Sequence, residues 1–290
     1  MAILFKISRL DRDFSCTADG GARFFVGRRV TYEGRIGLYN VFAGSKLEKL
    51  RYKAADFETD YGFWASVIEP TATVEGGGLF LTLNTYDSAR FTFGFGQFAA
   101  HVANGDFVKY LRAMLTLPDA PAYFPHLGVV GGRICKTDGA MPQALEDDES
   151  TSKLMRYLNP SSDEVEDSEV IAAAKLIHWT SNSAAARATQ VKQMVDTFRE
   201  HVNRADRRVG LDGVSADCCC VIADILHHGR NGADRWPRIE AALRTSRPLA
   251  ELLEIGLPRW KERLDGMKSA IAARPQLTGK AWSRAAGDFR

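Results

Sequence analysis

Residues 68–98, IEPTATVEGGGLFLTLNTYDSARFTFGFGQF, carry the strongest structural and chemical signals in this chain. Glu69 follows a segment whose apolar residues have helical spacing. Pro70 predicts that this helix ends beside Glu69, because proline does not continue a helix comfortably. Three glycines at 76–78 predict a turn, and alternating apolar residues follow them. The stretch therefore predicts a carboxyl group at a helix end, directly before a small β element.

Asp87 supplies a second carboxyl group between two predicted strands, 79–83 and 91–95. A hairpin that folds back over a helix end would bring it close to Glu69. Cleavage of a glycosidic bond uses two such groups, one to protonate the leaving oxygen and one to activate a water or stabilise the oxocarbenium ion. Apolar neighbours favour the protonated form of Glu69, and Arg90 would keep Asp87 ionised. Alone, each acid more often has a structural role, as an exposed helix glutamate or a turn aspartate.

The residues after the second acid suit contact with a sugar chain. Gly94 and Gly96 would let a sugar approach the backbone closely, although close packing of a strand on a helix explains them equally well. Gln97 offers a donor and an acceptor for sugar hydroxyl or N-acetyl groups. Thr92 and Gln97 are an odd number of positions apart, so an unbroken strand would point them to opposite faces. We therefore expect the strand to break at the glycines and helical structure to begin over 97–102.

The order of these residues resembles the lysozyme-like superfamily. Soluble lytic transglycosylases and goose-type lysozymes of that superfamily carry a Gly-x-x-Gln type of segment after the catalytic glutamate, as GFGQF follows Glu69 here. Residues 87–98, DSARFTFGFGQF, are more similar to bacterial chitosanases of the same superfamily. The positions that match identically are Asp87, Thr92, Gly94 and Phe98, and Phe91 replaces another aromatic residue. The family's arginine falls at Ala89, and Gln97 fits the transglycosylase pattern instead.

This resemblance, which covers roughly residues 56–116, implies roles for the matching positions. Glu69 would be the general acid and Asp87 the general base, with Thr92 positioning the attacking water and the anomeric configuration inverting. The substrate-binding residues would be Arg90, Gly94, Gly96 and Gln97. The glycan stays open between peptidoglycan and a chitosan-like polymer, and lytic transglycosylase chemistry stays open beside hydrolysis.

The rest of the chain predicts a mainly α protein with a small β hairpin or sheet. The resemblance implies the two-lobed α+β architecture of lysozyme-like enzymes. Helices are expected at 152–158, 163–178, 184–203, 214–229, 236–245, 248–255 and 257–273. The expected organisation is an N-terminal arm or small β segment at 1–55, a catalytic domain with a helical C-terminal lobe at 56–275, and a basic, frayed tail at 276–290.

Composition narrows the classes of function. The chain has 290 residues, of which 45% are hydrophobic and 26% charged, as in ordinary globular proteins. Its net charge of +2 is too small to argue for nucleic-acid binding. No stretch approaches the roughly 18–20 apolar residues that cross a bilayer. The apolar run at the N-terminus is too short for a secretory signal. We therefore expect synthesis in the cytoplasm without a classical export signal and no membrane partner.

The remaining motifs indicate no cofactor and no metal. The five cysteines include the run 218–220 and contain no CxxC pair, so buried reduced thiols are expected. Asp224 and His228 share one helix face, which permits a metal site, but a satisfied core role is the simpler interpretation. The acidic stretch 143–169 is expected to be a solvated loop, and a surface for a cationic partner is the alternative. No GxSxG, GxGxxG or P-loop sequence occurs.

Two functional interpretations follow. The first is a glycoside hydrolase of an amino-sugar polymer that reaches the periplasm or cell wall by a non-classical route, as a phage-type lysin or a secreted antibacterial effector. An effector would have an immunity protein or a component of a secretion machine as partner. The second interpretation is a non-catalytic structural or adaptor protein on a lysozyme-like scaffold. Whether Glu69 and Asp87 share one open cleft would discriminate the two.

Overall fold

The computed structural model describes all residues, 1–290, as two compact units. Unit 1 comprises Met1–Arg51 and Leu79–Gln193, and unit 2 comprises Tyr52–Gly78 and Met194–Arg290. About 44% of the residues are helical and 17% are in strands. The mixed α+β class that the sequence predicts is therefore confirmed, with more strand than a single small hairpin.

The units do not coincide with the expected boundaries at residues 55 and 275. The chain leaves unit 1 after Arg51, contributes one helical stretch to unit 2, and returns at Leu79. The expected catalytic range, 56–275, therefore contains parts of both units. The sequence could not show this, because the hydrophobic pattern marks elements and not the units in which they pack.

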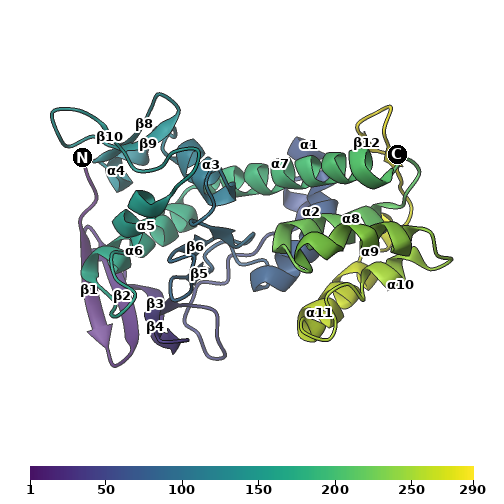
Figure 1. Ribbon diagram of the computed structural model, residues 1–290. Coiled ribbons are helices and arrows are strands. Elements are labelled where there is room, and N and C mark those ends of the chain that lie inside the picture. The colour runs from purple at the N-terminus through teal and green to yellow at the C-terminus, as the bar shows by residue number, and fades with distance from the viewer. The chain divides into compact units, whose positions relative to one another are not determined.

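Unit 1 contains an antiparallel sheet of seven strands, in sequence order (Figure 1). Its strands are β1 (Phe5–Leu10), β2 (Asp13–Ala18), β3 (Phe24–Tyr32), β4 (Arg35–Tyr39), β5 (Leu83–Asn84), β6 (Thr92–Phe93) and β7 (Phe98–Ala99). In β2, Phe14 and Cys16 are buried and alternate with less buried residues, as expected for a strand with one covered face. Helix α6 (Asp167–Asn182) packs on β1, β2 and β3. The N-terminal segment is thus a regular meander of four strands, not an irregular arm.

The two predicted strands of this sheet, β5 and β6, are shorter than expected, and β7 was not predicted. Of the expected run 79–83, only Leu83 pairs in the sheet, together with Asn84 just beyond it. Of the expected run 91–95, only Thr92 and Phe93 pair. The predicted helical start over 97–102 is wrong, because β7 occupies its first half and pairs Phe98 with Phe93. Gln97 has a φ of +51°, a left-handed conformation that a right-handed helix cannot contain.

A second, three-stranded sheet and several helices complete unit 1. The sheet consists of β8 (Leu127–Val130), β9 (Arg133–Lys136) and β10 (Gln143–Ala144). The helices are α3 (Asp106–Met114), α4 (Ala120–Tyr123), α5 (Ser152–Leu158), α6 and the first part of α7 (Ala184–Val209). Glu146, a buried member of the acidic stretch, accepts two hydrogen bonds from Arg112 of α3, at 2.7 and 3.0 Å. This part of the stretch is therefore an internal anchor and not a solvated loop.

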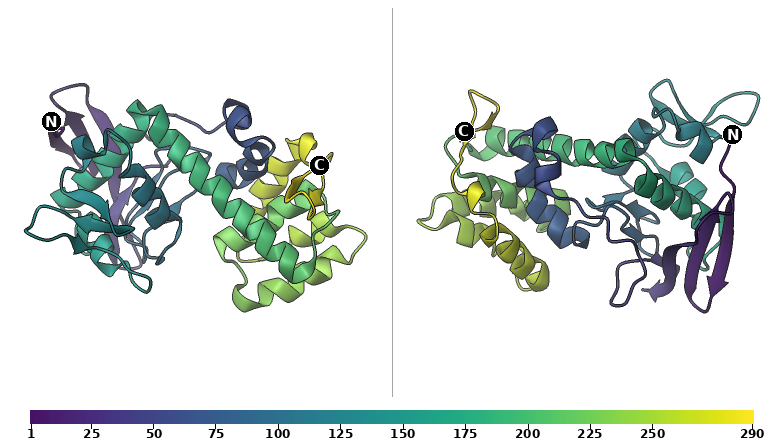
Figure 2. Two further views of the ribbon diagram at one scale, coloured as in Figure 1. Left: turned by 90° about the horizontal axis from the view of Figure 1, so that it is seen from above. Right: turned by 180° about the vertical axis from the view of Figure 1, so that it is seen from behind.

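Unit 2 is mainly helical (Figure 2, green to yellow for its C-terminal part). Its elements are η1 (Ala54–Asp56), α1 (Glu58–Tyr61), α2 (Trp64–Gly76), the end of α7, α8 (Ala216–His228), η2 (Gly232–Asp234), α9 (Arg235–Leu243), α10 (Pro248–Leu252), α11 (Lys261–Ala272), η3 (Pro275–Leu277), β11 (Trp282–Ser283) and β12 (Asp288–Phe289). Helix α2 packs against both α8 and α11. None of the helices in the chain combines the length and hydrophobicity needed to cross a membrane.

Helix α2 continues through Pro70, so the predicted helix end beside Glu69 is wrong. Proline removes one backbone donor and disturbs the preceding turn. Two neighbours support the helix there. The Tyr52 hydroxyl donates to the Ala65 carbonyl at 2.7 Å, and the Cys220 thiol donates to the Val67 carbonyl at 3.2 Å. The helix ends instead at Gly77, which adopts the left-handed conformation with a φ of +64°.

The C-terminal tail is ordered, which corrects the expectation of a frayed end. Strands β11 and β12 pair with each other, and Trp282 and Phe289 are buried. Both rings pack against Trp64 of α2, with centroid distances of 6.1 and 5.0 Å. An aromatic cluster of this kind buries enough apolar surface to hold a short terminal hairpin in place.

Candidate functional site

Glu69 lies in the middle of α2, and both of its carboxylate oxygens accept hydrogen bonds. Arg274 Nε donates to Oε2 at 2.5 Å, and the Ala54 backbone amide donates to Oε1 at 3.1 Å. Arg274 is itself fixed, because its Nη1 donates to the Ala270 carbonyl at 2.6 Å. The Glu69 side chain is 19% exposed. The carboxylate is thus held in one orientation by its neighbours, with an ion pair as the main contact.

Asp87 lies in a turn between β5 and β6. Its Oδ1 accepts a hydrogen bond from the Ala89 amide at 2.8 Å, and its Oδ2 accepts one from Asn84 Nδ2 at 2.9 Å. The first of these contacts is the local side-chain to backbone bond by which aspartate stabilises turns. The Arg90 backbone amide donates to the Asp87 backbone carbonyl at 3.1 Å, and the Arg90 guanidinium makes no hydrogen bond with the Asp87 side chain. The expected ion pair between the two side chains is therefore absent.

Residues 94–97 form a tight turn between β6, which contains Thr92, and β7. Thr92 is buried in β6, where it pairs with Ala99. The Gln97 backbone amide and its Nε2 both donate to the Gly94 carbonyl, at 3.0 and 3.2 Å. The side-chain amide of Gln97 thus closes the turn in which it lies. The expected break of the strand at the glycines is present, but a turn and a further strand follow it.

Gln190 of α7 fixes this glycine turn to the rest of unit 1. Its Oε1 accepts a hydrogen bond from the Phe95 amide at 3.2 Å, and its Nε2 donates to the Phe80 carbonyl at 3.2 Å. Gly94 has a φ of +89°, and a Cβ there would lie 2.5 Å from Gln190 Oε1. This position therefore needs glycine for two reasons, its backbone conformation and the close approach of Gln190.

The candidate residues are divided between the two units. Glu69 belongs to unit 2. Those in unit 1 are Asp87, Arg90, Thr92, Gly94, Gly96 and Gln97. Within unit 1, Asp87 lies in the connection that precedes β6 and the glycine turn follows β6, so the two are at opposite ends of this strand.

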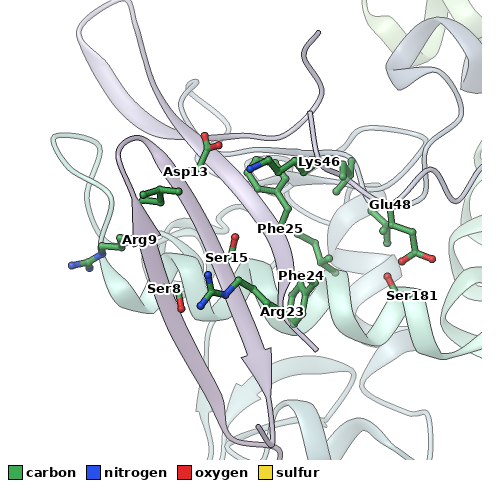
Figure 3. Close-up of a pocket in the computed structure, with 14 residues that line it drawn as sticks. Ser8, Arg9, Asp13, Ser15, Arg23, Phe24, Phe25, Lys46, Glu48 and Ser181 are labelled. Atoms are coloured by element: carbon green, nitrogen blue, oxygen red, sulfur yellow. The ribbon is translucent and has the colours of Figure 1, made fainter. Parts of the chain in front are cut away.

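Unit 1 contains a concave pocket of about 380 Å³, and none of these residues lines it (Figure 3). Phe25, Leu47 and Leu81 line it with buried apolar side chains. Ser8 and Ser15, which face each other across β1 and β2, contribute hydroxyl groups. Further polar residues at the pocket are Arg23, Lys46 and Glu48. An apolar base with a few polar groups is typical of pockets that bind small molecules.

The hydrogen-bond partners of Asp224 are Thr71, Arg230 and Arg263, and His228 is not among them. Arg230 and Arg263 each donate to one of its oxygens at 2.5 Å, and Thr71 donates to Oδ1 at 3.1 Å. Burial acts to raise the pKa of Asp224, but the two guanidinium groups hold it below its ordinary value. Asp224 therefore has the satisfied structural role in the core that the sequence favours over a metal site. No three His, Cys, Asp or Glu side chains gather in a way that could hold a metal ion.

The five cysteines are free and buried, as the sequence predicts. Burial raises the pKa of the Cys16 thiol to about 12 and that of Cys218 to about 11. These groups are therefore in the unreactive thiol form at neutral pH.

Sequence reasoning missed Glu169, the most unusual acid in the protein. It is fully buried, accepts a hydrogen bond from the Thr85 hydroxyl through Oε1, and has no partner at Oε2. Burial raises its pKa to about 7. The available signal was its place in the first turn of α6, where glutamate often contacts the backbone amides of the helix start.

Comparisons with protein-family models, with curated proteins and with solved structures give no match to this chain.

Proposed function

We propose that the protein is a glycoside hydrolase of an amino-sugar polymer, peptidoglycan or a chitosan-like glycan, with Glu69 as general acid and Asp87 as general base. The proposal includes a lysozyme-like fold and rests on the order of Glu69, Asp87, Thr92 and Gln97 in the sequence. The observation that carries it in the structure is that both carboxylates are held by hydrogen bonds from fixed neighbours. Orientation by surrounding groups is what acid–base catalysis requires of its residues.

The proposal places a specific demand on the ion pair. A general acid must carry a proton, whereas the Arg274 guanidinium donates to Glu69 Oε2. Arg274 must therefore turn away from Glu69 when the glycan binds. Thr92 would position the attacking water for inversion, and lytic transglycosylase chemistry would need no such water.

Action on peptidoglycan places the enzyme in the periplasm or cell wall after non-classical export. A phage-type lysin or a secreted antibacterial effector would fit, and an effector would have an immunity protein as partner.

A second candidate is a non-catalytic scaffold of the same architecture. It is favoured by the structural partners of both acids, since Arg274 ties Glu69 to the segment after α11 and Asp87 closes a turn. In this case the two carboxylates stabilise the fold and no bond is cleaved.

The deciding experiment is a digest of purified peptidoglycan and, in parallel, of chitosan, with the products identified by mass spectrometry. Reducing-end products, or anhydro-sugar products in the case of a transglycosylase, would support the enzyme. Loss of these products in both Glu69→Gln and Asp87→Asn, with the fold retained, would show that cleavage requires both carboxyl groups. The absence of products from the intact protein on both polymers rejects the enzyme and leaves the scaffold.

A further inference from the structure

A groove of about 770 Å³ in unit 2 gathers four arginines around one tryptophan. The end of α7 contributes Arg204, Arg207 and Arg208, and the start of α9 contributes Arg235 and Trp236. The three arginines of α7 are exposed, and Arg235 and Trp236 are half-buried. The whole chain carries a net charge of only +2, so this concentration of cations is local.

None of the four guanidinium groups has a carboxylate partner. The single acidic residue that lines the groove, Glu240, pairs with Arg244 instead, at 2.5 Å. Arg235 donates to the Gly232 carbonyl, which leaves its charge uncompensated. Four like charges at close range repel one another, and this repulsion is relieved when an anion binds between them.

Trp236 orients two of these arginines. The Cζ atoms of Arg204 and Arg208 lie 5.8 and 5.2 Å from its ring centroid, within the range of a cation–π interaction. The ring thereby holds two long side chains at the groove, which reduces the entropy that they would lose on binding a ligand.

Stabilisation of the helices does not account for the cluster. Arg207 and Arg208 lie in the last turn of α7, where cations interact favourably with the helix dipole. Arg204 precedes that turn, and Arg235 is the first residue of α9, an end at which the dipole disfavours a cation.

We propose that this groove binds the phosphate groups of a polyanion. A guanidinium donates two parallel hydrogen bonds to phosphate oxygens, and it is the preferred side chain for this contact. On α7, the Cβ atoms of residues three and four positions apart stand about 5–6 Å apart, a spacing at which neighbouring arginines can contact adjacent phosphates of one polyanion. Because Arg204 and Arg208 contact the Trp236 ring, phosphate contacts dominate over stacking of bases on the indole.

The test compares the double variant Arg204→Gln/Arg208→Gln with a matched control, Arg29→Gln/Arg35→Gln. The control removes two exposed arginines from β3 and β4 of unit 1 and changes the net charge equally. Binding of a fluorescent single-stranded oligothymidine is measured by anisotropy over a salt series, and binding of inorganic tripolyphosphate by calorimetry.

The groove variant should bind at least about tenfold more weakly than the wild type, and the control should bind like the wild type. The slope of log affinity against log salt for the oligonucleotide should fall by about 1.4 in the groove variant, since each lost phosphate contact removes about 0.7. Loss with the oligonucleotide alone identifies a nucleic acid as the source of phosphate, and loss with tripolyphosphate alone identifies free polyphosphate.

Three outcomes would overturn the proposal. They are an equal loss in the control, no binding of either phosphate probe by the wild type at low salt, and equally tight binding of polyglutamate, which would indicate an acidic protein partner. Arg207→Gln, which removes a residue with no ring contact, repeats the test if the double variant does not fold, and it should weaken binding in the same direction.

Discussion

Arg274 Nε lies 2.5 Å from Glu69 Oε2, and this ion pair joins the middle of helix α2 to the segment that follows α11. The two residues are 205 positions apart in the chain. Both side chains are mostly shielded from solvent, at 17% and 19% exposure. The pair is therefore a structural link in unit 2, and the acid role that we propose for Glu69 requires this contact to open.

Replacing Glu69 by glutamine tests the acid role directly. If Glu69 protonates the leaving oxygen, turnover on the cleaved glycan should fall by about 10²–10⁴-fold. Glutamine keeps an oxygen that accepts from Arg274, so the free energy of unfolding should fall by only about 1–2 kcal/mol. Product formation by mass spectrometry and urea denaturation measure the two effects on the same preparation.

Arg274→Ala is the matched control for this experiment. It removes the same ion pair but leaves the carboxyl group of Glu69 in place. Turnover that persists in Arg274→Ala and disappears in Glu69→Gln assigns the proton to Glu69. If both variants lose stability alike and Glu69→Gln retains more than a tenth of the turnover, Glu69 is a structural residue.

Glu169 predicts a decline in stability from weakly acid to alkaline pH. Burial raises its pKa from 4.5 in the unfolded chain to about 7 in the folded protein. The folded state therefore holds the proton more tightly, and this contribution is complete below about pH 4.5 and lost as the pH rises through 7. The contribution is about 3 kcal/mol. Urea denaturation near pH 5 and near pH 8 measures it.

Glu169→Gln should remove most of that decline, since glutamine stays neutral and still accepts from Thr85. The variant should consequently be the more stable protein near pH 8. Glu164→Gln, an exposed substitution in the same stretch, is the control and should leave the decline unchanged. An unaltered pH profile in Glu169→Gln would show that another group titrates.

Much of the helical part of the fold is predictable from the sequence. The expected helix 152–158 coincides with α5, and the helices placed by periodicity at 214–229 and 236–245 lie within two residues of α8 and α9. In these segments the apolar spacing and the glycines or prolines at the ends all agree. Local signals suffice where every local signal indicates the same structure.

The failures occur where distant residues decide the local structure. Pro70 does not end α2, because Tyr52 and Cys220 support the backbone around it. The tail does not fray, because Trp282 meets Trp64 from more than 200 positions earlier. The sequence immediately around residues 70 and 282 does not indicate which distant residues contact them.

The candidate site shows the same limit. The turn formed by Asp87 could be predicted, since aspartate closes such turns through adjacent backbone amides. The partners of the other motif residues could not. Arg274 at Glu69 and Gln190 at Gly94 come from segments far along the chain, and an amphipathic pattern does not specify which distant polar side chain contacts which residue.

Gly94→Ala should destabilise unit 1 by more than its backbone conformation alone explains. A left-handed φ costs a non-glycine residue about 1–2 kcal/mol. The added Cβ would also lie 2.5 Å from Gln190 Oε1, so Gln190 must give up its contacts with the turn. We expect a total loss of about 2–4 kcal/mol in the free energy of unfolding, measured by urea denaturation.

Gly20→Ala separates the cost of the left-handed backbone conformation from the cost of displacing Gln190. Gly20 has a similar φ of +74°, and a Cβ there meets nothing within 4 Å. This variant should show the conformational cost alone, about 1–2 kcal/mol. Equal losses in both variants would mean that Gln190 moves without cost and does not fix the turn.

Asp224→Asn should be the most destabilising of these substitutions. It removes the charge that Arg230 and Arg263 share inside unit 2, where Arg230 and Asp224 are fully shielded from solvent. Breaking a buried ion pair from one side leaves an uncompensated charge and typically costs 3–5 kcal/mol, so a loss of about that size is expected. Glu75, at 2.7 Å from Arg263, can compensate only one of the two guanidinium groups.

The exposed pair of Lys261 and Asp265 supplies the control: Asp265→Asn should cost at most about 1 kcal/mol, because solvent screens exposed pairs. Urea denaturation of the two variants beside the wild type measures both costs. A loss in Asp224→Asn as small as that in Asp265→Asn would mean that water enters the cluster, and that Asp224 does not anchor α8 to α11.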